Sequence, residues 1–333
     1  MSAPPKALVV TSGLLEPSRY RALGVRVCPL VPIANRPLVL HVLDGLRAAG
    51  VREVAVLGDG ATRAEVASMV GEVGPELAIR YLDHVDDRAL DAPAVAVQPA
   101  DAVLTAPLET VLGAVAAARF AGAVVRVPAI APALGAGEPP AVSSAAHVGA
   151  CVLGPEAAGR LGGALDAEGS VDALADALLA SSPRVHEEEV RGCLACCDGD
   201  DGLLRANRLA LESLRAGAGA EDAALTDTEI QGPAVIHPTA IVRSTLIRGP
   251  AIIGAGVRLN DVYVGPYTSI GDDVVIEGAE IEHSLVLAGA EVRYPGVRLT
   301  TSIIGPRARL VRDFHLPRGM RVAVGADAVV ALS

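Results

Sequence analysis

The spacing of apolar residues changes once along the chain, near residue 220. Up to that point, short apolar runs alternate with Ala-rich segments in which apolar residues recur at helical spacing. This alternation predicts an α/β domain with a largely parallel sheet, because each helix returns the chain to begin the next strand in the same direction. The expected strands cover residues 7–10, 53–57, 78–82, 94–97, 122–127 and 147–153. The expected helices cover residues 38–49, 61–70, 108–120, 171–179 and 201–216.

From residue 230 onward, aliphatic residues recur about every six positions, and a glycine or another small residue often follows them. The positions that carry this period are Ile230, Ile236, Val242, Ile247, Ile253, Leu259, Val264, Ile270 and Ile276. Such a period predicts a parallel β-helix built from hexapeptide repeats, in which the aliphatic side chain points inward and the small residue fits a tight corner. An antiparallel β-sandwich is the alternative.

We therefore predict two domains, an α/β domain over residues 1–220 and a β-helix over residues 221–333, with a Gly-Ala linker at residues 217–220. The chain of 333 residues is 51% hydrophobic but only 2% aromatic, and it has no Trp. Its cores must therefore be built from Ala, Val, Leu and Ile, which suits parallel sheets and β-helices.

The charge and the hydropathy of the chain limit its partners and its location. The formal net charge of -11 argues against nucleic acid or an anionic membrane as a partner. No apolar run approaches the roughly 18 residues of a membrane-spanning helix, and no secretory signal is visible before the first strand, so we expect a cytoplasmic protein. Lys6 is the only lysine, whereas arginine is plentiful. Any mechanism that needs a second lysine ammonium is therefore excluded.

Two stretches carry the strongest motifs. The first, residues 6–37, comprises an apolar strand, a loop of small and polar residues and the segment LVPIANRP. The second lies in the region with the six-residue period and contains VGPYTSIG at residues 264–271 and EIEHSLVL at residues 280–287. Both stretches resemble the sugar-nucleotide nucleotidyltransferase family, in particular the long-type glucose-1-phosphate thymidylyltransferases. With LLRANR at residues 203–208, the resemblance covers nearly the whole chain. It implies a Rossmann-like nucleotidyltransferase domain followed by a left-handed β-helix.

The reaction that this resemblance implies transfers a nucleotidyl group from a nucleoside triphosphate to a sugar phosphate. It needs a glycine-rich phosphate loop, cationic side chains and carboxylates that hold Mg²⁺. Where the family has A-G-G-x-G-T-R, this chain has TSGLLEP over residues 11–17. Only Gly13 survives, while Leu15 and Glu16 place a branched side chain and a like charge where the triphosphate should lie. Arg19 could replace the missing arginine only if the loop is rebuilt.

The family's catalytic residues match this chain unevenly. The catalytic lysine aligns with Cys28, and Arg26 fits the arginine that often precedes that lysine motif. Asp101 fits the first Mg²⁺-binding aspartate, and an exposed aspartate at a strand end is the alternative. Cys196 stands at the second carboxylate position, unless a shift of two residues lets Asp198 take that role.

The walls of the implied pocket are also altered. Residues 83–88 stand where the family's base-reading segment should begin, so that this segment is largely deleted, and the sugar-contacting motif has no lysine. Ser143 and Gly149 fall in step with the family's sugar-pocket wall, but both could equally be small residues that packing requires.

The cysteines and histidines leave further roles open. In the family fold, Cys28 and residues 193–197 face one pocket, where thiolates could bind Zn²⁺ or serve redox chemistry. Buried cysteines in an Ala/Val-rich core are more commonly small apolar residues. Many β-helix proteins are acyltransferases with a histidine base, so His237, His283 and His315 must be weighed against purely structural roles.

The missing features affect the phosphate loop, the catalytic lysine, the base segment, the sugar lysine and the second carboxylate. Each such group commonly supplies more than the roughly 1.4 kcal/mol that equals a tenfold rate. Their joint loss predicts a catalytically degenerate member that serves as a regulatory or scaffold subunit, or as a sensor of a sugar phosphate or nucleotide. An active nucleotidyltransferase with Mg²⁺ on Asp101 and Asp198, and a β-helix acyltransferase, are the alternatives. We expect a homo-oligomer, or a hetero-oligomer with an active homologue.

Overall fold

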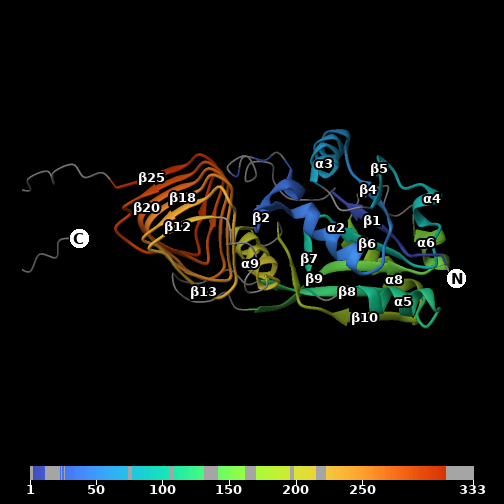
Figure 1. The fold of residues 1–333 in the computed structure, drawn as a ribbon. Helices are drawn as coiled ribbons and strands as arrows, with labels where there is room; N and C mark the ends of the chain where they lie inside the picture. The colour runs from blue at the N-terminus through green and yellow to red at the C-terminus, as the bar shows by residue number, and fades with distance from the viewer. Residues whose placement is uncertain are drawn as a thin grey trace, which may run out of the picture.

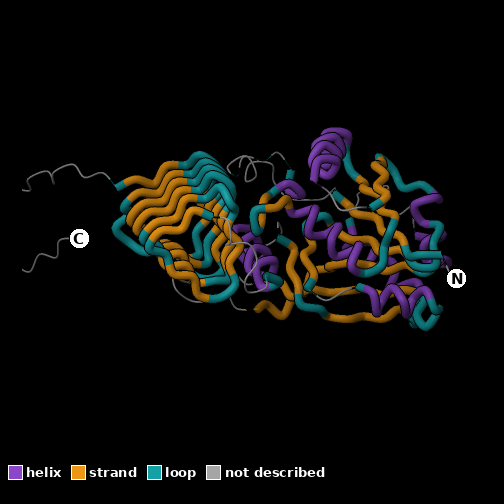
Figure 2. The backbone as a smooth tube through the Cα atoms, viewed as in Figure 1, coloured by secondary structure: helices purple, strands orange, loops and turns teal. Residues whose placement is uncertain are grey.

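The structure, a computed structural model, describes residues 3–11, 23, 25, 27–73, 77–105, 108–130, 142–161, 170–195, 199–214 and 223–312. An α/β domain comes first and a coil of short parallel strands follows it (Figure 1, Figure 2). The boundary predicted at residue 220 lies outside the described residues, between the last helix and the first strand of the coil. Within the described ranges, none of the helices is both long and apolar enough to cross a lipid bilayer.

A seven-stranded sheet in the order β10-β8-β9-β6-β1-β4-β5 forms the centre of the α/β domain. Its strands are β1 (Lys6–Val10), β4 (Glu53–Leu57), β5 (Ala78–Leu82), β6 (Val95–Pro99), β8 (Gly122–Ile130), β9 (Val142–Leu153) and β10 (Val185–Glu189). β1 runs parallel to β4 and β6, whereas β9 runs antiparallel to both β6 and β8. The predicted α/β fold with a mostly parallel sheet is confirmed.

Both faces of the sheet are covered along its central strands, which is why these strands are largely apolar. In β1, Ala7 and Val9 belong to one buried cluster, and Leu8 and Val10 belong to another. The first cluster includes side chains of α2, α3 and α5, and the second includes side chains of α6 and α8. The helices are α2 (Leu38–Ala48), α3 (Gly60–Val73), α4 (Asp87–Leu90), α5 (Glu109–Ala116), α6 (Pro155–Leu161), α8 (Val171–Ser181) and α9 (Gly199–Glu212).

All five predicted helices differ from the observed ones by one or more residues at their ends, two of them by four residues at the C-terminal end, and several short elements were not predicted. The helix expected over residues 108–120 ends at Ala116, because Ala118 takes a left-handed backbone conformation with φ 55°. The helix expected over residues 201–216 covers Gly199–Glu212. The short unpredicted elements are η1 (Cys28–Leu30), β2 (Pro32–Ile33), β3 (Arg36–Pro37), β7 (Ala102–Leu104) and β11 (Gly192–Leu194).

The second domain is a parallel β-helix with three faces. One face consists of β12 (Ala224–Thr226), β15 (Ile241–Arg243), the first part of β18 (Arg258–Val264), the first part of β20 (Val275–Glu282), β22 (Glu291–Arg293) and β25 (Arg309–Val311). A second face consists of β13 (Glu229–Gln231), β16 (Leu246–Arg248), the later parts of β18 and β20, and β23 (Leu299–Thr300). The third consists of β14 (Ala234–Ile236), β17 (Ala251–Ile253), β19 (Thr268–Ile270), β21 (Leu285–Val286) and β24 (Ile303–Ile304).

The interior of this coil is filled by the aliphatic residues that the sequence period identified. Ile230 is partly buried, and the other predicted inward positions are at most 1% exposed. Ala234 pairs with Ala251 and Ala251 pairs with Thr268, so the chain returns to the same face after about three hexapeptides. Every described strand pair in this domain is parallel, and the antiparallel sandwich is therefore wrong.

Helix α9 lies between the two domains and joins them through a buried asparagine (Figure 1). The Asn207 Oδ1 atom accepts hydrogen bonds from the Ala34 amide at 2.8 Å and from the Ser269 hydroxyl at 2.6 Å. Its Nδ2 donates to the Tyr267 carbonyl at 3.2 Å. Asn35 also donates from Nδ2 to the Ile270 carbonyl at 2.6 Å. The LVPIANRP segment is thereby fixed against the β-helix.

Candidate functional site

The carboxyl ends of β1, β4, β5 and β6 meet at one edge of the sheet, where parallel sheets commonly bind ligands. Main-chain hydrogen bonds hold this edge together: Thr11 donates to Leu57 at 2.8 Å, and Ala100 donates to Val10 at 2.9 Å. The predicted pocket residues Gly13 and Arg19, and the predicted cation Arg26, lie outside the described residues.

Asp101 lies at this edge, in the turn between β6 and β7. It is 0% exposed, so the alternative of an exposed aspartate at a strand end is wrong. Its carbonyl accepts from the Ala195 amide at 3.0 Å, and β7 pairs antiparallel with β11 beside it. The structure thus brings residues 193–195 next to Asp101. Cys196 and Asp198, the two residues considered for the second carboxylate position, lie outside the described residues.

The described residues do not fit a Mg²⁺ site. Mg²⁺ usually keeps several of its own waters and takes only one or two carboxylates. Asp101 is 0% exposed, so its carboxylate does not face the solvent from which a hydrated ion would approach. In the part of the chain that the structure describes, no three His, Cys, Asp or Glu side chains are grouped as a metal site would require. We therefore derive no reaction step through a metal ion.

Cys28, which the sequence resemblance aligned with the family's lysine, lies in η1 and is 2% exposed. It packs in one buried cluster with Cys193, Val31 and Leu203, so that the two cysteine segments considered for a thiolate site do come together. Cys28 is disulfide-bonded, whereas Cys193 carries a thiol. A sulfur in a disulfide is not a thiolate ligand for Zn²⁺, and it carries no positive charge toward a phosphate.

The only lysine lies at the opposite edge of the sheet. Lys6 begins β1, and its ammonium lies 3.3 Å from the Glu53 carboxylate and donates to the Arg88 carbonyl at 3.0 Å. The carboxyl end of β1 is four residues further along, roughly 13 Å away at strand spacing. No lysine ammonium can therefore act beside Asp101.

One cation at the carboxyl edge was missed from the sequence. Arg63 lies on α3, and its side chain runs beside Gly58 and Gly60, where the chain leaves β4. Its Nη1 is 4.0 Å from the Asp83 carboxylate, and the side chain is 25% exposed. A Cβ atom at Gly58 would lie 1.9 Å from the Thr11 hydroxyl, so only glycine allows this close approach. The glycines at positions 58 and 60, just after a predicted strand, were the only sequence signal that could have pointed to Arg63.

The N-terminus of α3 is satisfied by its own sequence. Asp59 accepts from the Ala61 and Thr62 amides at 2.9 Å and from the Thr62 hydroxyl at 2.7 Å. These bonds, with the Thr62 amide as the largest cause, lower the pKa of the Asp59 carboxyl. The helix end closest to the predicted phosphate loop is therefore already capped by a carboxylate.

The segment at residues 83–88 forms a helix cap in place of a base-reading loop. Asp86 accepts from the Ala89 amide at 2.9 Å at the start of α4, and it forms an ion pair with Arg80. The Arg80 guanidinium is the main cause of the lowered pKa of the Asp86 carboxyl. Asp83 lies 2.8 Å from the exposed ring of His84. The chain then passes directly into β6.

Gly149 is required by packing. A Cβ atom there would lie 3.0 Å from both the Leu104 Cδ2 and the Val127 Cγ1 atoms. This contact favours the packing interpretation that the sequence left open beside the sugar-pocket wall. The side chain of Ser143 lies outside what the structure describes.

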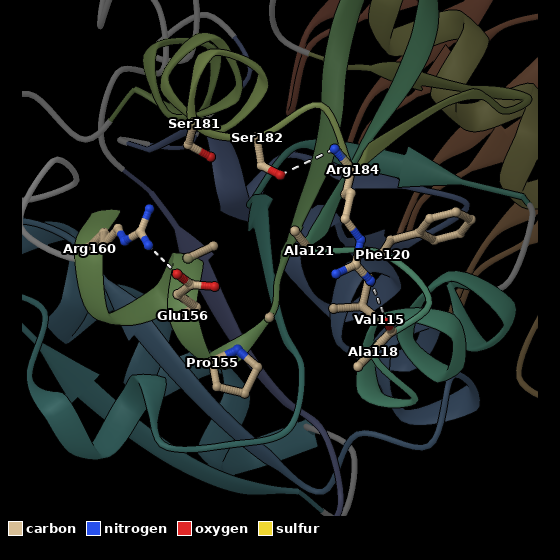
Figure 3. A pocket seen from close by; sticks show the side chains of 12 residues that line it. Val115, Ala118, Phe120, Ala121, Pro155, Glu156, Arg160, Ser181, Ser182 and Arg184 are labelled. Carbon is tan, nitrogen blue, oxygen red and sulfur yellow. Dashed lines mark hydrogen bonds and ion pairs between the residues drawn. The ribbon is translucent and has the colours of Figure 1, made fainter.

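A cavity of about 460 Å³ lies at the other end of the sheet, where β8 and β10 begin and β9 ends (Figure 3). Arg160, paired with Glu156, stands on one side of it, and Arg184, which donates to the Ala118 carbonyl at 2.8 Å, stands on the other. None of the predicted site residues lines this cavity. It is distinct from the Asp101 edge.

The β-helix histidines are engaged in turn contacts. His237 Nδ1 lies 2.9 Å from the Thr239 hydroxyl and accepts from the Thr239 amide at 3.2 Å. The His283 ring stacks on Tyr267 with ring centroids 5.3 Å apart. His315 lies outside the described residues. These contacts favour the structural roles over a general base.

A mostly parallel sheet with Asp101 at its carboxyl edge, docked through α9 on a parallel β-helix, defines a nucleotidyltransferase-type protein with a C-terminal β-helix. The chain is 28% identical over 322 residues to a glucose-1-phosphate thymidylyltransferase of Streptomyces griseus, across 83% of this chain and 85% of that protein. It is 32% identical over 130 residues to a glucose-1-phosphate thymidylyltransferase of Streptomyces antibioticus, across 39% of this chain and 36% of that protein. The similarity along most of the chain supports a nucleotidyltransferase family member.

The chain was also compared with protein-family models and with solved structures. No protein-family model matches the chain. A crystal structure of a provisionally named glucose-1-phosphate thymidylyltransferase from Bacillus anthracis, solved in complex with a sucrose, superposes with a TM-score of 0.47 at 15% identity, over 64% of this chain and 97% of that one.

Proposed function

We propose that this chain is a nucleotidyltransferase-like protein of the glucose-1-phosphate thymidylyltransferase type that no longer performs the usual nucleotidyl transfer. It acts instead as a regulatory or scaffold subunit, or as a protein that binds a nucleotide or sugar phosphate. The observation that carries this proposal is the position of the only lysine at the amino edge of the sheet, held by Glu53 and the Arg88 carbonyl.

The loss of a positioned cation has a large expected effect. Nucleotidyl transfer proceeds by positioning and by neutralising charge that develops on the transferring phosphate, and removing one such donor typically lowers the rate by about 10²–10³. At the lysine position this chain has Cys28, which is buried and disulfide-bonded. The burial of Asp101 adds a second obstacle, because a carboxylate that is 0% exposed cannot reach a hydrated metal ion without a local rearrangement.

Some capacity to bind an anion remains at the same edge. Arg63 is 25% exposed, and beside it the Thr11 hydroxyl lies against Gly58. A guanidinium at the carboxyl ends of parallel strands is well suited to a phosphate group. This supports ligand binding without turnover, which is the property of a sensor.

The experiment compares binding with turnover in one preparation. We expect dTTP or glucose 1-phosphate to raise the melting temperature, because a ligand that binds only the folded state stabilises it. The same protein with Mg²⁺ and both substrates should release no more pyrophosphate than a no-protein control. Arg63→Gln should reduce the stabilisation, whereas Arg243→Gln, an exposed arginine on the β-helix, should not.

The alternative of an active nucleotidyltransferase rests on family membership and on Asp101, which keeps its place at the end of β6. Pyrophosphate release above the control, abolished by Asp101→Asn, would establish that alternative. Stabilisation by neither ligand would leave the scaffold role, in which the chain holds a second copy or an active homologue.

A further inference from the structure

A groove with a volume of about 270 Å³ lies where α9 meets the β-helix. Among the residues that the structure describes, none of those assigned to the nucleotidyltransferase site lines it. The side chains that matter for its chemistry come from both domains: Arg191, Arg205 and Arg208 from the first, and Tyr267, His283 and Thr301 from the second.

The β-helix contributes a column of corner residues. Tyr267, His283 and Thr301 each come two positions before paired residues of β19, β21 and β24, so they stack on successive coils. All three have left-handed backbones, with φ of 58°, 50° and 46°. This conformation turns the chain sharply and directs three side chains toward the same face of α9.

The column contains two aromatic rings stacked on each other, with a cation over one of them. The Tyr267 and His283 rings stack with an interplanar angle of 30°, and the Arg208 guanidinium lies 4.5 Å from the centroid of the Tyr267 ring. Burial is the main cause of the lowered pKa of His283. A further planar ring can join such a stack of rings and guanidinium.

The groove carries an excess of positive charge in a chain whose net charge is -11. Glu212 accepts from Arg191 at 2.5 Å and from Arg208 at 3.2 Å, so one carboxylate is shared between two guanidiniums. Asp201 is the acidic side chain that lines the groove itself. Within the described ranges, no carboxylate forms an ion pair with Arg205, which is half-buried. Arg205 is therefore placed to receive an anionic group.

We infer that this interdomain groove binds a nucleoside monophosphate, with the base on Tyr267 and His283 and the phosphate on Arg205 and Arg208. The volume is just below the ~300–1,000 Å³ of most ligand pockets, which suits one ring system with a single phosphate. A nucleoside triphosphate or a nucleotide sugar is larger and more strongly charged than the site allows.

Such a ligand would touch both domains at once. It would therefore favour the docked arrangement of α9 on the β-helix over any arrangement that separates them. This inference does not depend on the proposed function, since it uses no residue of the Asp101 edge.

The test is isothermal titration of the full-length protein with dTMP, AMP, inorganic phosphate and thymidine. We expect saturable binding of the two nucleotides, at least tenfold weaker binding of phosphate, and no binding of thymidine. Arg205→Gln should weaken nucleotide binding at least tenfold, and Tyr267→Leu should weaken it about tenfold through loss of stacking. Because Tyr267 is half-buried, a melting curve must show that Tyr267→Leu is folded. If Tyr267→Leu does not fold, Arg205→Gln alone tests the proposed binding site.

Arg243→Gln serves as the matched control and should bind nucleotide like the original protein. Absence of saturable binding by either nucleotide, or equal binding by Arg205→Gln and the original protein, would each overturn the inference.

Discussion

Asn207 connects three segments that are far apart in the sequence, and its replacement by alanine tests how the domains are held together. The side chain is 0% exposed and bonds to the Ala34 amide, the Ser269 hydroxyl and the Tyr267 carbonyl. In Asn207→Ala the Ala34 amide and the Ser269 hydroxyl lose their acceptor in a buried site. A buried polar group without a partner costs about 1–3 kcal/mol, and Ser269 can rotate to recover part of that.

We therefore expect Asn207→Ala to lose about 2–4 kcal/mol of stability, equal to a fall of roughly 3–6 °C in melting temperature for a protein of this size. Circular dichroism on heating measures the shift, and separate transitions of the two domains would show directly that docking has weakened. The matched control is Asn260→Ala, an exposed asparagine on β18. If Asn207→Ala melts within about 1 °C of the original protein and of that control, the hydrogen bonds through Asn207 do not hold the domains together.

Three further predictions concern packing and titration. Gly192→Ala should destabilise the β7–β11 pair, because its Cβ would lie 2.6 Å from the Val103 carbonyl. Gly45→Ala in α2 meets nothing within 4 Å and should increase the stability of the protein by about 0.5–1 kcal/mol. Equal melting temperatures of the two variants would contradict this prediction. Burial lowers the pKa of His41, so the unfolded chain takes up its proton first and stability should fall as pH drops below about 6.5. His41→Gln should flatten that fall between pH 7.5 and 5.5, and an unchanged slope would refute it. Burial also raises the pKa of the Cys151 thiol to about 12, so iodoacetamide at pH 8.5 should label Cys151 only after unfolding; labelling of the native protein, seen by mass spectrometry, would be the contrary result.

The central strands could be predicted because both faces of the sheet are buried. β4 has the predicted bounds, since burial on both faces makes nearly every residue of a short run apolar. β5, at the edge of the sheet, also has the predicted bounds, although its residues are only partly buried. The edge strand β10 was missed, because three of its residues are glutamates that point to solvent and leave no apolar run. The helix expected over residues 108–120 was predicted too long because alanine favours a helix, so the sequence carries no signal of the left-handed turn at Ala118.

The candidate site could be predicted only in part. The resemblance placed Asp101 at the end of a strand, but its burial depends on the pairing of β7 with β11, whose residues are about ninety positions apart. Arg63 belongs to no motif and is recognisable only once β4 and α3 are placed. The role of Asn207 was hidden for the same reason, because its partners lie in the LVPIANRP segment and in the β-helix.

The most direct test of the account is whether the chain forms a nucleotide sugar at all. Purified protein is incubated for many hours at high concentration with Mg²⁺, dTTP and glucose 1-phosphate, and ³¹P NMR follows the diphosphate resonances of the product, with an active family member as the positive control. With its only lysine fixed at the amino edge of the sheet and Cys28 buried in a disulfide, this protein should leave both substrates unchanged. Product that accumulates with time, and that disappears in Asp101→Asn, would contradict the account.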